Sequence, residues 1–119
     1  MKNKLLLASC FFLCSSLVAE ESSYNIIQTN HSDVYIKNAQ CEDNYRLTFN
    51  VVNKSDKYVW RVNLTVYDPS GDPVDQGKLE FKYPNYIRAQ SGYAGSIGIK
   101  NCKALEKTHK LSFTVDKEK

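Results

Sequence analysis

Histidine, the residue that most often serves as a general base, is scarce in this 119-residue chain, which has only His31 and His109. Neither has neighbours at the spacing of a zinc site, which needs several converging ligands. No Gly-x-Ser-x-Gly nucleophile motif is present, and Gly92, Gly95 and Gly98 recur in a strand pattern rather than ahead of a helix, where a phosphate-binding loop would lie. We therefore predict that the protein is not an enzyme and has no catalytic, cofactor-binding or metal-binding residues.

One acidic turn resembles part of a calcium-binding loop. It contains Asp68, Asp72 and Asp75, but the glutamate that would complete the loop is missing and Pro73 interrupts it. We interpret the segment as a turn, and weak calcium binding remains the alternative hypothesis.

The chain has one long apolar run, residues 5–13, which is shorter than the roughly 20 residues of a membrane-spanning helix. Lys2 and Lys4 precede the run, and small residues ending at Ala19 follow it. This order is typical of a secretory signal peptide. We expect residues 1–19 to be removed during export through the Sec pathway, so that the mature protein is secreted or periplasmic and has no membrane span.

A second interpretation of the leader uses Leu7-Ala8-Ser9-Cys10, which resembles a bacterial lipoprotein box. The segment between Lys4 and Cys10 is short for that role, so cleavage after Ala19 is favoured. Removal of the leader takes Lys and Arg from 16 to 14 against 13 Asp and Glu, and the formal charge from +3 to +1. This near-neutral charge gives no electrostatic footprint for nucleic acid. We expect a single domain over residues 20–119.

The mature chain keeps two of the four cysteines, Cys41 and Cys102. They do not form a Cys-x-x-Cys redox motif, and an even pair in an exported domain favours a structural disulfide over a reactive thiol. The bond would close a loop of roughly 60 residues, worth about 4 kcal/mol at most in the chain-entropy model.

Apolar and polar residues alternate along the mature chain, a pattern that predicts strands with one buried and one solvated face. Turn-forming residues separate the runs, and Trp60 lies in one of them, where we expect it in the core. The spacing indicates an all-β, seven-stranded sandwich of the fibronectin-III or immunoglobulin type. The expected strands lie near residues 24–28, 34–36, 45–51, 60–66, 79–83, 93–99 and 111–115.

Tyrosine is abundant, with eight residues. Tyr86 and Tyr93 flank a connection that also contains Arg88, and Tyr83 lies just before it, where we expect it to cover one end of the core. Tyrosine and arginine often anchor protein interfaces. We therefore identify these four residues as a candidate partner-binding surface, the tyrosine surface; the alternative is that the tyrosines reflect strand propensity alone.

Two stretches resemble a known family of small secreted bacterial domains. Residues 50–55, Asn-Val-Val-Asn-Lys-Ser, and the segment Leu64-Thr65-Val66-Tyr67-Asp68 followed by Gly71 are similar to domains named for a Phe-x-Leu-Tyr-Asp motif. Leu64 stands where that motif has Phe, and Val66 where it has Leu. The resemblance covers about half of the mature chain and implies a sandwich fold.

The signal peptide, the size and the single fibronectin-III-like sandwich also resemble the bacterial interleukin receptor mimic family. That resemblance implies a secreted virulence factor that binds host cytokines as a domain-swapped homodimer. No family site residue carries over to this sequence. We therefore expect a secreted protein-binding module, and the alternative is a non-catalytic periplasmic structural or accessory protein of the envelope.

Overall fold

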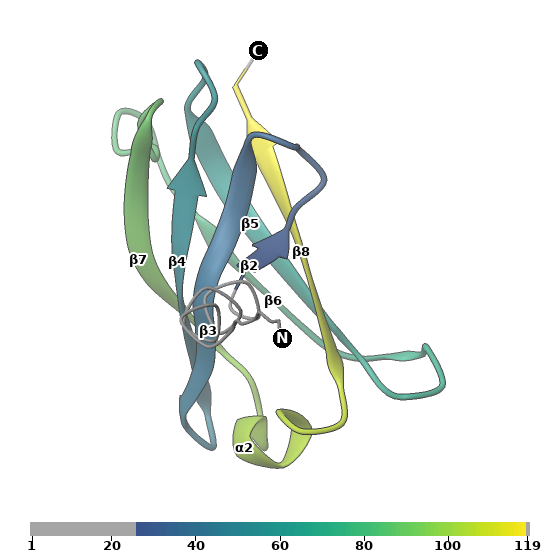
Figure 1. Cartoon of the computed structure of the whole chain (residues 1–119). Coiled ribbons are helices and arrows are strands. Elements are labelled where there is room, and N and C mark those ends of the chain that lie inside the picture. Colours follow the sequence, from purple (N-terminus) through teal and green to yellow (C-terminus); the bar gives the residue numbers. More distant parts are fainter. Residues whose placement is uncertain (1–25, 119) are drawn as a thin grey trace, which may run out of the picture.

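The computed structural model describes residues 26–118, which form seven strands and one short helix (Figure 1). The predicted signal peptide, residues 1–19, and Tyr24 of the first expected strand lie outside these residues. The elements are β2 (Ile26–Gln28), β3 (Val34–Asp43), β4 (Arg46–Asn53), β5 (Val59–Tyr67), β6 (Pro73–Glu80), β7 (Ser91–Gly98), α2 (Cys102–Leu105) and β8 (Lys110–Lys117).

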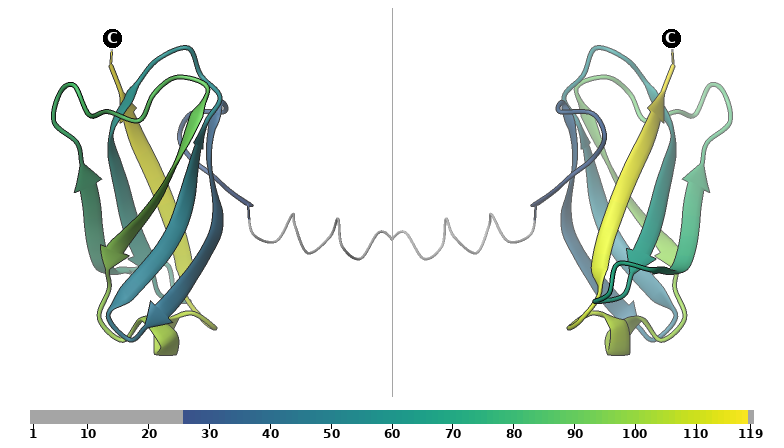
Figure 2. Two further views of the ribbon diagram at one scale, coloured as in Figure 1. Left: turned by 90° about the vertical axis from the view of Figure 1, so that its left-hand side faces the viewer. Right: turned by 90° about the vertical axis from the view of Figure 1, so that its right-hand side faces the viewer.

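The strands form two antiparallel sheets that face each other, as the side views in Figure 2 show. One sheet has the order β2-β3-β4-β7 and the other has the order β6-β5-β8. In immunoglobulin terms β3-β4-β7 follow the order A-B-E, and β6-β5-β8 follow the order C′-C-F. The predicted all-β sandwich is therefore confirmed, and no described strand occupies the G position beside β8.

The alternating runs predicted from the sequence supply the core between the sheets. Phe49 of β4 and Phe113 of β8 are buried, and their ring centroids lie 5.1 Å apart across the two sheets. Residues at every second position of β4, β8 and the intervening β5 are buried with them, because successive side chains of a strand point to opposite faces. This set comprises Leu47, Val51, Val62, Leu64, Val66 and Val115.

The predicted disulfide is confirmed: Cys41 of β3 bonds to Cys102 at the start of α2, with Cα atoms 5.7 Å apart. It fastens the short helix to the first sheet at the lower end of the molecule in Figure 1. The helix α2 is a single turn, and its buried residue is Cys102 itself.

The prediction that Trp60 lies in the core is wrong. A register irregularity between Val59 and Arg61 interrupts the alternation, so Val59 is buried and Trp60 is only partly buried. The Trp60 ring instead forms a cation–π contact with the Arg61 guanidinium, whose central carbon lies 4.6 Å from the ring centroid. A bulge adds one residue to a strand and thereby reverses the facing of the side chains beyond it.

Candidate protein-binding surface

The tyrosine surface lies on and beside the loop that joins β6 to β7, residues 81–90. In Figure 1 this loop is at the upper end of the sandwich, opposite α2. Tyr83, Tyr86 and Arg88 belong to the loop, and Tyr93 belongs to β7.

Ile87 anchors the loop to the sandwich. Its side chain is 4% exposed, and its backbone pairs with Val59 through two hydrogen bonds of 2.9 Å, one donated by each residue. The apolar side chain and the paired backbone fix the middle of the loop. The backbone of Tyr86 and Arg88, the two neighbours of Ile87, is therefore held in place.

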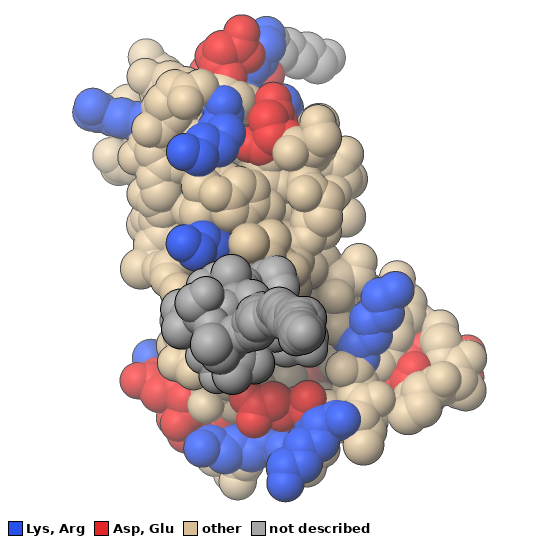
Figure 3. All heavy atoms as spheres, viewed as in Figure 1, with Lys and Arg blue, Asp and Glu red and all other residues tan. Residues whose placement is uncertain are grey.

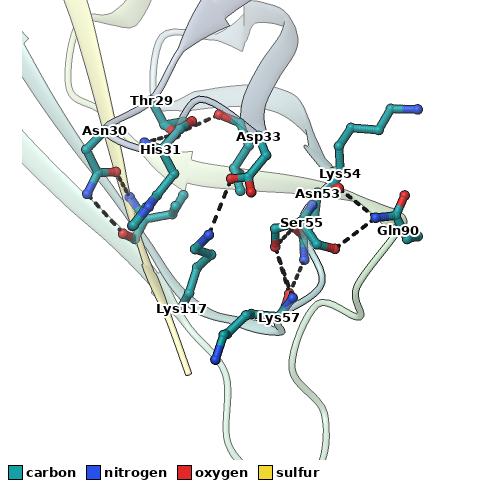
Figure 4. A network of polar contacts seen from close by, with 12 residues as sticks. Thr29, Asn30, His31, Asp33, Asn53, Lys54, Ser55, Lys57, Gln90 and Lys117 are labelled. Carbon is teal, nitrogen blue, oxygen red and sulfur yellow. Dashed lines mark hydrogen bonds and ion pairs between the residues drawn. The ribbon is translucent and has the colours of Figure 1, made fainter. Parts of the chain in front are cut away.

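A buried polar network holds the base of the same loop (Figure 4). Asn53, at the end of β4, is fully buried, and its Nδ2 donates to the carbonyls of Lys57 at 2.8 Å and Arg88 at 3.0 Å. Its Oδ1 accepts from the backbone N–H and the hydroxyl of Ser55, at 3.1 and 2.6 Å. A buried amide with all of these partners specifies one arrangement of the chain, because each lost bond would leave a buried polar group without a partner.

Gln90 closes the network from the other side of the loop. Its Nε2 donates to the carbonyls of Lys54, at 2.6 Å, and Ser55, at 3.1 Å. The turn after β4 and the loop before β7 are thus fastened to each other by side chains as well as by packing (Figure 4).

Two tyrosines of the tyrosine surface pair with each other, the third pairs with Phe81 outside it, and Arg88 is the fourth residue. The rings of Tyr83 and Tyr86 meet edge to face with centroids 6.0 Å apart, whereas Tyr93 packs edge to face on Phe81 at 4.9 Å. Arg88 is exposed, and no ion pair joins it to another of the described residues.

Tyr83 does not cover the core as predicted, because its side chain is 80% exposed. Phe81, two residues earlier, packs against the core instead. The chain leaves the second sheet after Glu80, so the alternation that placed Tyr83 on the inner face no longer applies.

One partly buried aromatic–cation pair next to this surface was missed from the sequence. Arg61 lies over Trp60, and its Nε also donates to Asp116 Oδ2 at 2.7 Å. The Trp60 carbonyl accepts a hydrogen bond from the N–H of Phe81 at 2.9 Å, which places this pair beside the start of the loop of residues 81–90. Burial opposes ionisation of Asp116, but hydrogen bonds from Arg61 and Asn63 outweigh it and lower the pKa of this carboxyl.

The two histidines lie in different parts of the fold, His31 in the turn between β2 and β3 and His109 just before β8. Across residues 26–118 no group of His, Cys, Asp and Glu is arranged to hold a metal ion. In the acidic turn, Asp68 Oδ1 accepts from the Ser70 hydroxyl and from the N–H groups of Ser70 and Asp72. The Ser70 hydroxyl bond is the main cause of a lowered pKa at Asp68. These bonds use the Asp68 carboxylate to hold the turn.

No helix within the described part of the chain is long and apolar enough to cross a membrane. Comparison with protein-family models, with curated proteins and with solved structures gives no match to the chain.

Proposed function

We propose that this chain is an exported, non-catalytic domain that binds another protein through the tyrosine surface. The observation that carries the proposal is the contrast between a fixed backbone and exposed side chains in one loop. Ile87 and the Asn53 network hold the loop, while Tyr83 and Arg88 extend into solvent. Exposed aromatic and arginine side chains on a held backbone bind at a lower entropic cost than those of a mobile loop, because the backbone does not have to be ordered on binding.

The disulfide supports the export part of the proposal, since such bonds persist in oxidising compartments. The resemblance to interleukin receptor mimics makes a host cytokine the first class of partner to test, with a role in virulence. The same resemblance raises the proposal that the active form is a homodimer.

The test is binding of the exported protein, with its disulfide formed, to a panel of immobilised human interleukins. We expect at least one to bind, and Tyr86→Ala and Arg88→Ala each to raise its Kd tenfold or more. Tyr45→Ala is the matched control, because Tyr45 is 73% exposed in the turn between β3 and β4, away from the tyrosine surface. Its Kd should stay within twofold of the unmodified protein.

Two results would contradict the proposal in different ways. Absence of binding to every interleukin would remove cytokines as the partner class. Equal losses for Tyr45→Ala and Arg88→Ala, with unchanged unfolding midpoints, would show that the tyrosine surface has no special part in binding.

A further inference from the structure

The outer edge of β8 has backbone groups that face away from its only described sheet partner, β5. In an antiparallel pair the N–H and C=O groups of successive residues point alternately towards and away from the partner strand. Asn30 shows which residues of β8 point away. Its Oδ1 accepts the Val115 N–H at 2.8 Å, and its Nδ2 donates to the Val115 carbonyl at 3.3 Å.

Leu111 and Phe113 have the same orientation as Val115, because they precede it by four and two residues in one regular register. Within residues 26–118 no hydrogen bond reaches the outward backbone groups of these two residues. The side chain of Asn30 therefore takes the place of a neighbouring strand at Val115. At Leu111 and Phe113 no described group bonds to the outward backbone groups.

An apolar groove lies directly against this free edge. It has a volume of about 670 Å³, and β2 and β8 form parts of its walls. Figure 1 shows these two strands with α2 below them. The apolar residues that line it include Ile27, Leu47, Val66, Ile99, Leu105 and Leu111.

Two lysines without an ion-pair partner among the described residues lie at the end of the groove nearest α2. Lys110 lines it, and Lys107 lies with Lys110 in the adjoining hollow; neither forms an ion pair with another described residue. Glu106 also lines the groove, but its Oε2 accepts the N–H of Cys41 at 3.0 Å. Figure 3 shows basic and acidic side chains close together at this lower end of the molecule. An acidic group on a ligand would complement the two lysines.

We propose that this groove, the β8 groove, binds an extended peptide segment of another protein, which adds to β8 as a further strand. Backbone bonds to Leu111 and Phe113 would hold the segment, as in other cases of strand addition at a sheet edge. Alternate side chains of the segment would be apolar and fill the groove, and an acidic residue would lie by Lys107 and Lys110. Asn30 limits the free edge to about five residues, from Lys110 to Thr114, or roughly 17 Å of strand.

The test begins with a display library of random heptapeptides, selected against the exported protein with its disulfide formed. We expect the selected peptides to have apolar residues at alternate positions and an acidic residue near one end. Leu111→Pro removes the outward N–H without removing a bond to β5, and Leu111→Ala controls for the lost side chain. We expect the peptides to bind Leu111→Pro at least tenfold more weakly than Leu111→Ala.

N-methylated peptides test the same point without altering the protein. Alternate amides of a strand face opposite edges, so methylation of one alternate set should abolish binding, whereas methylation of the other set should leave it within threefold. Tyr86→Ala and Arg88→Ala should not change peptide affinity, which separates this proposal from the tyrosine surface.

Several outcomes would overturn the proposal. The first is that no peptides are recovered, or that the selected peptides do not alternate apolar and polar residues. The second is equal peptide binding to both Leu111 variants when both are folded. The third is peptide binding that survives either set of N-methyl groups. A dimer of the unmodified protein that dissociates in Leu111→Pro would assign the groove to a second copy. Peptide binding only by a chain that begins at Ile26, and not by one that begins at Glu20, would assign it to the protein's own preceding segment.

Discussion

The two sides on which the sheets of this sandwich meet are built differently. On one side β6 and β7 pack closely: Gly77 faces Ile97, Gly95 faces Leu79, and Phe81 packs edge to face on Tyr93. On the other side β2 and β8 are separated by the β8 groove. Packing closes the first side. The second side is open, and Cys41 and Cys102, which form the disulfide, both line its groove.

Glycine makes the packed side possible. A Cβ atom at Gly95 would lie 2.7 Å from Leu79 Cδ1, and one at Gly77 would overlap the Cγ2 methyl of Ile97. On the open side neither β2 nor β8 contains a glycine that would permit such a close approach. The comparison indicates that packing holds the β6–β7 side, whereas the disulfide and the polar contacts of Asn30 with Val115 and of Asp33 with Lys117 restrain the β2–β8 side and leave the groove between them.

The largest expected effect comes from removing that bond. The double substitution Cys41→Ala and Cys102→Ala should lower the free energy of unfolding by up to about 4 kcal/mol, because the unfolded chain gains the freedom of a loop closed over a separation of 61 residues. Urea unfolding followed by circular dichroism measures this. Reduction of the unmodified protein with dithiothreitol is the control and should give a similar loss. A loss below about 1 kcal/mol would show that the open side is held by other contacts.

A smaller effect is expected on the packed side. Gly77→Ala should lower the free energy of unfolding by about 1–3 kcal/mol, because its new methyl group must displace the buried Ile97 side chain. Gly98→Ala is the matched control on β7, since the nearest atom to its Cβ would be the Tyr45 carbonyl oxygen at 3.7 Å. That variant should stay within about 0.5 kcal/mol of the unmodified protein. Equal effects of the two substitutions would mean that the close approach of β6 to β7 does not stabilise the fold.

The sequence could predict much of the fold, because alternation and an even cysteine pair are local signals that require no knowledge of the partner strand. The runs around Phe49, Leu64 and Phe113 all face inward as their period predicts. The disulfide could likewise be predicted once the leader cysteines were set aside. Tyr83 and Trp60 were misplaced because strand ends and bulges depend on where pairing stops, which the period does not reveal.

The candidate sites were less predictable, since they depend on contacts between distant segments. Tyr86 and Arg88 could be chosen from residue type and position. The bond from Asn53 to the Arg88 carbonyl spans 35 residues, and nothing in the local sequence distinguishes Asn53 from any other turn asparagine. The β8 groove was not predicted at all, because an unpaired edge becomes visible only when the order of the strands is known.

The smallest expected effect concerns Asn30, which provides the one hydrogen-bonding side chain at the outer edge of β8 among the described residues. Asn30→Ala should lower the free energy of unfolding by about 1 kcal/mol, because it removes two hydrogen bonds to the Val115 backbone at a partly buried position. Hydrogen exchange should accelerate at the Val115 amide and remain unchanged at the Thr114 amide, which faces β5. Asn30→Asp keeps the acceptor and should preserve most of the Val115 protection while losing the bond to its carbonyl. Unchanged exchange at Val115 in Asn30→Ala would show that another group protects this edge, and the open side would then be less open than its groove implies.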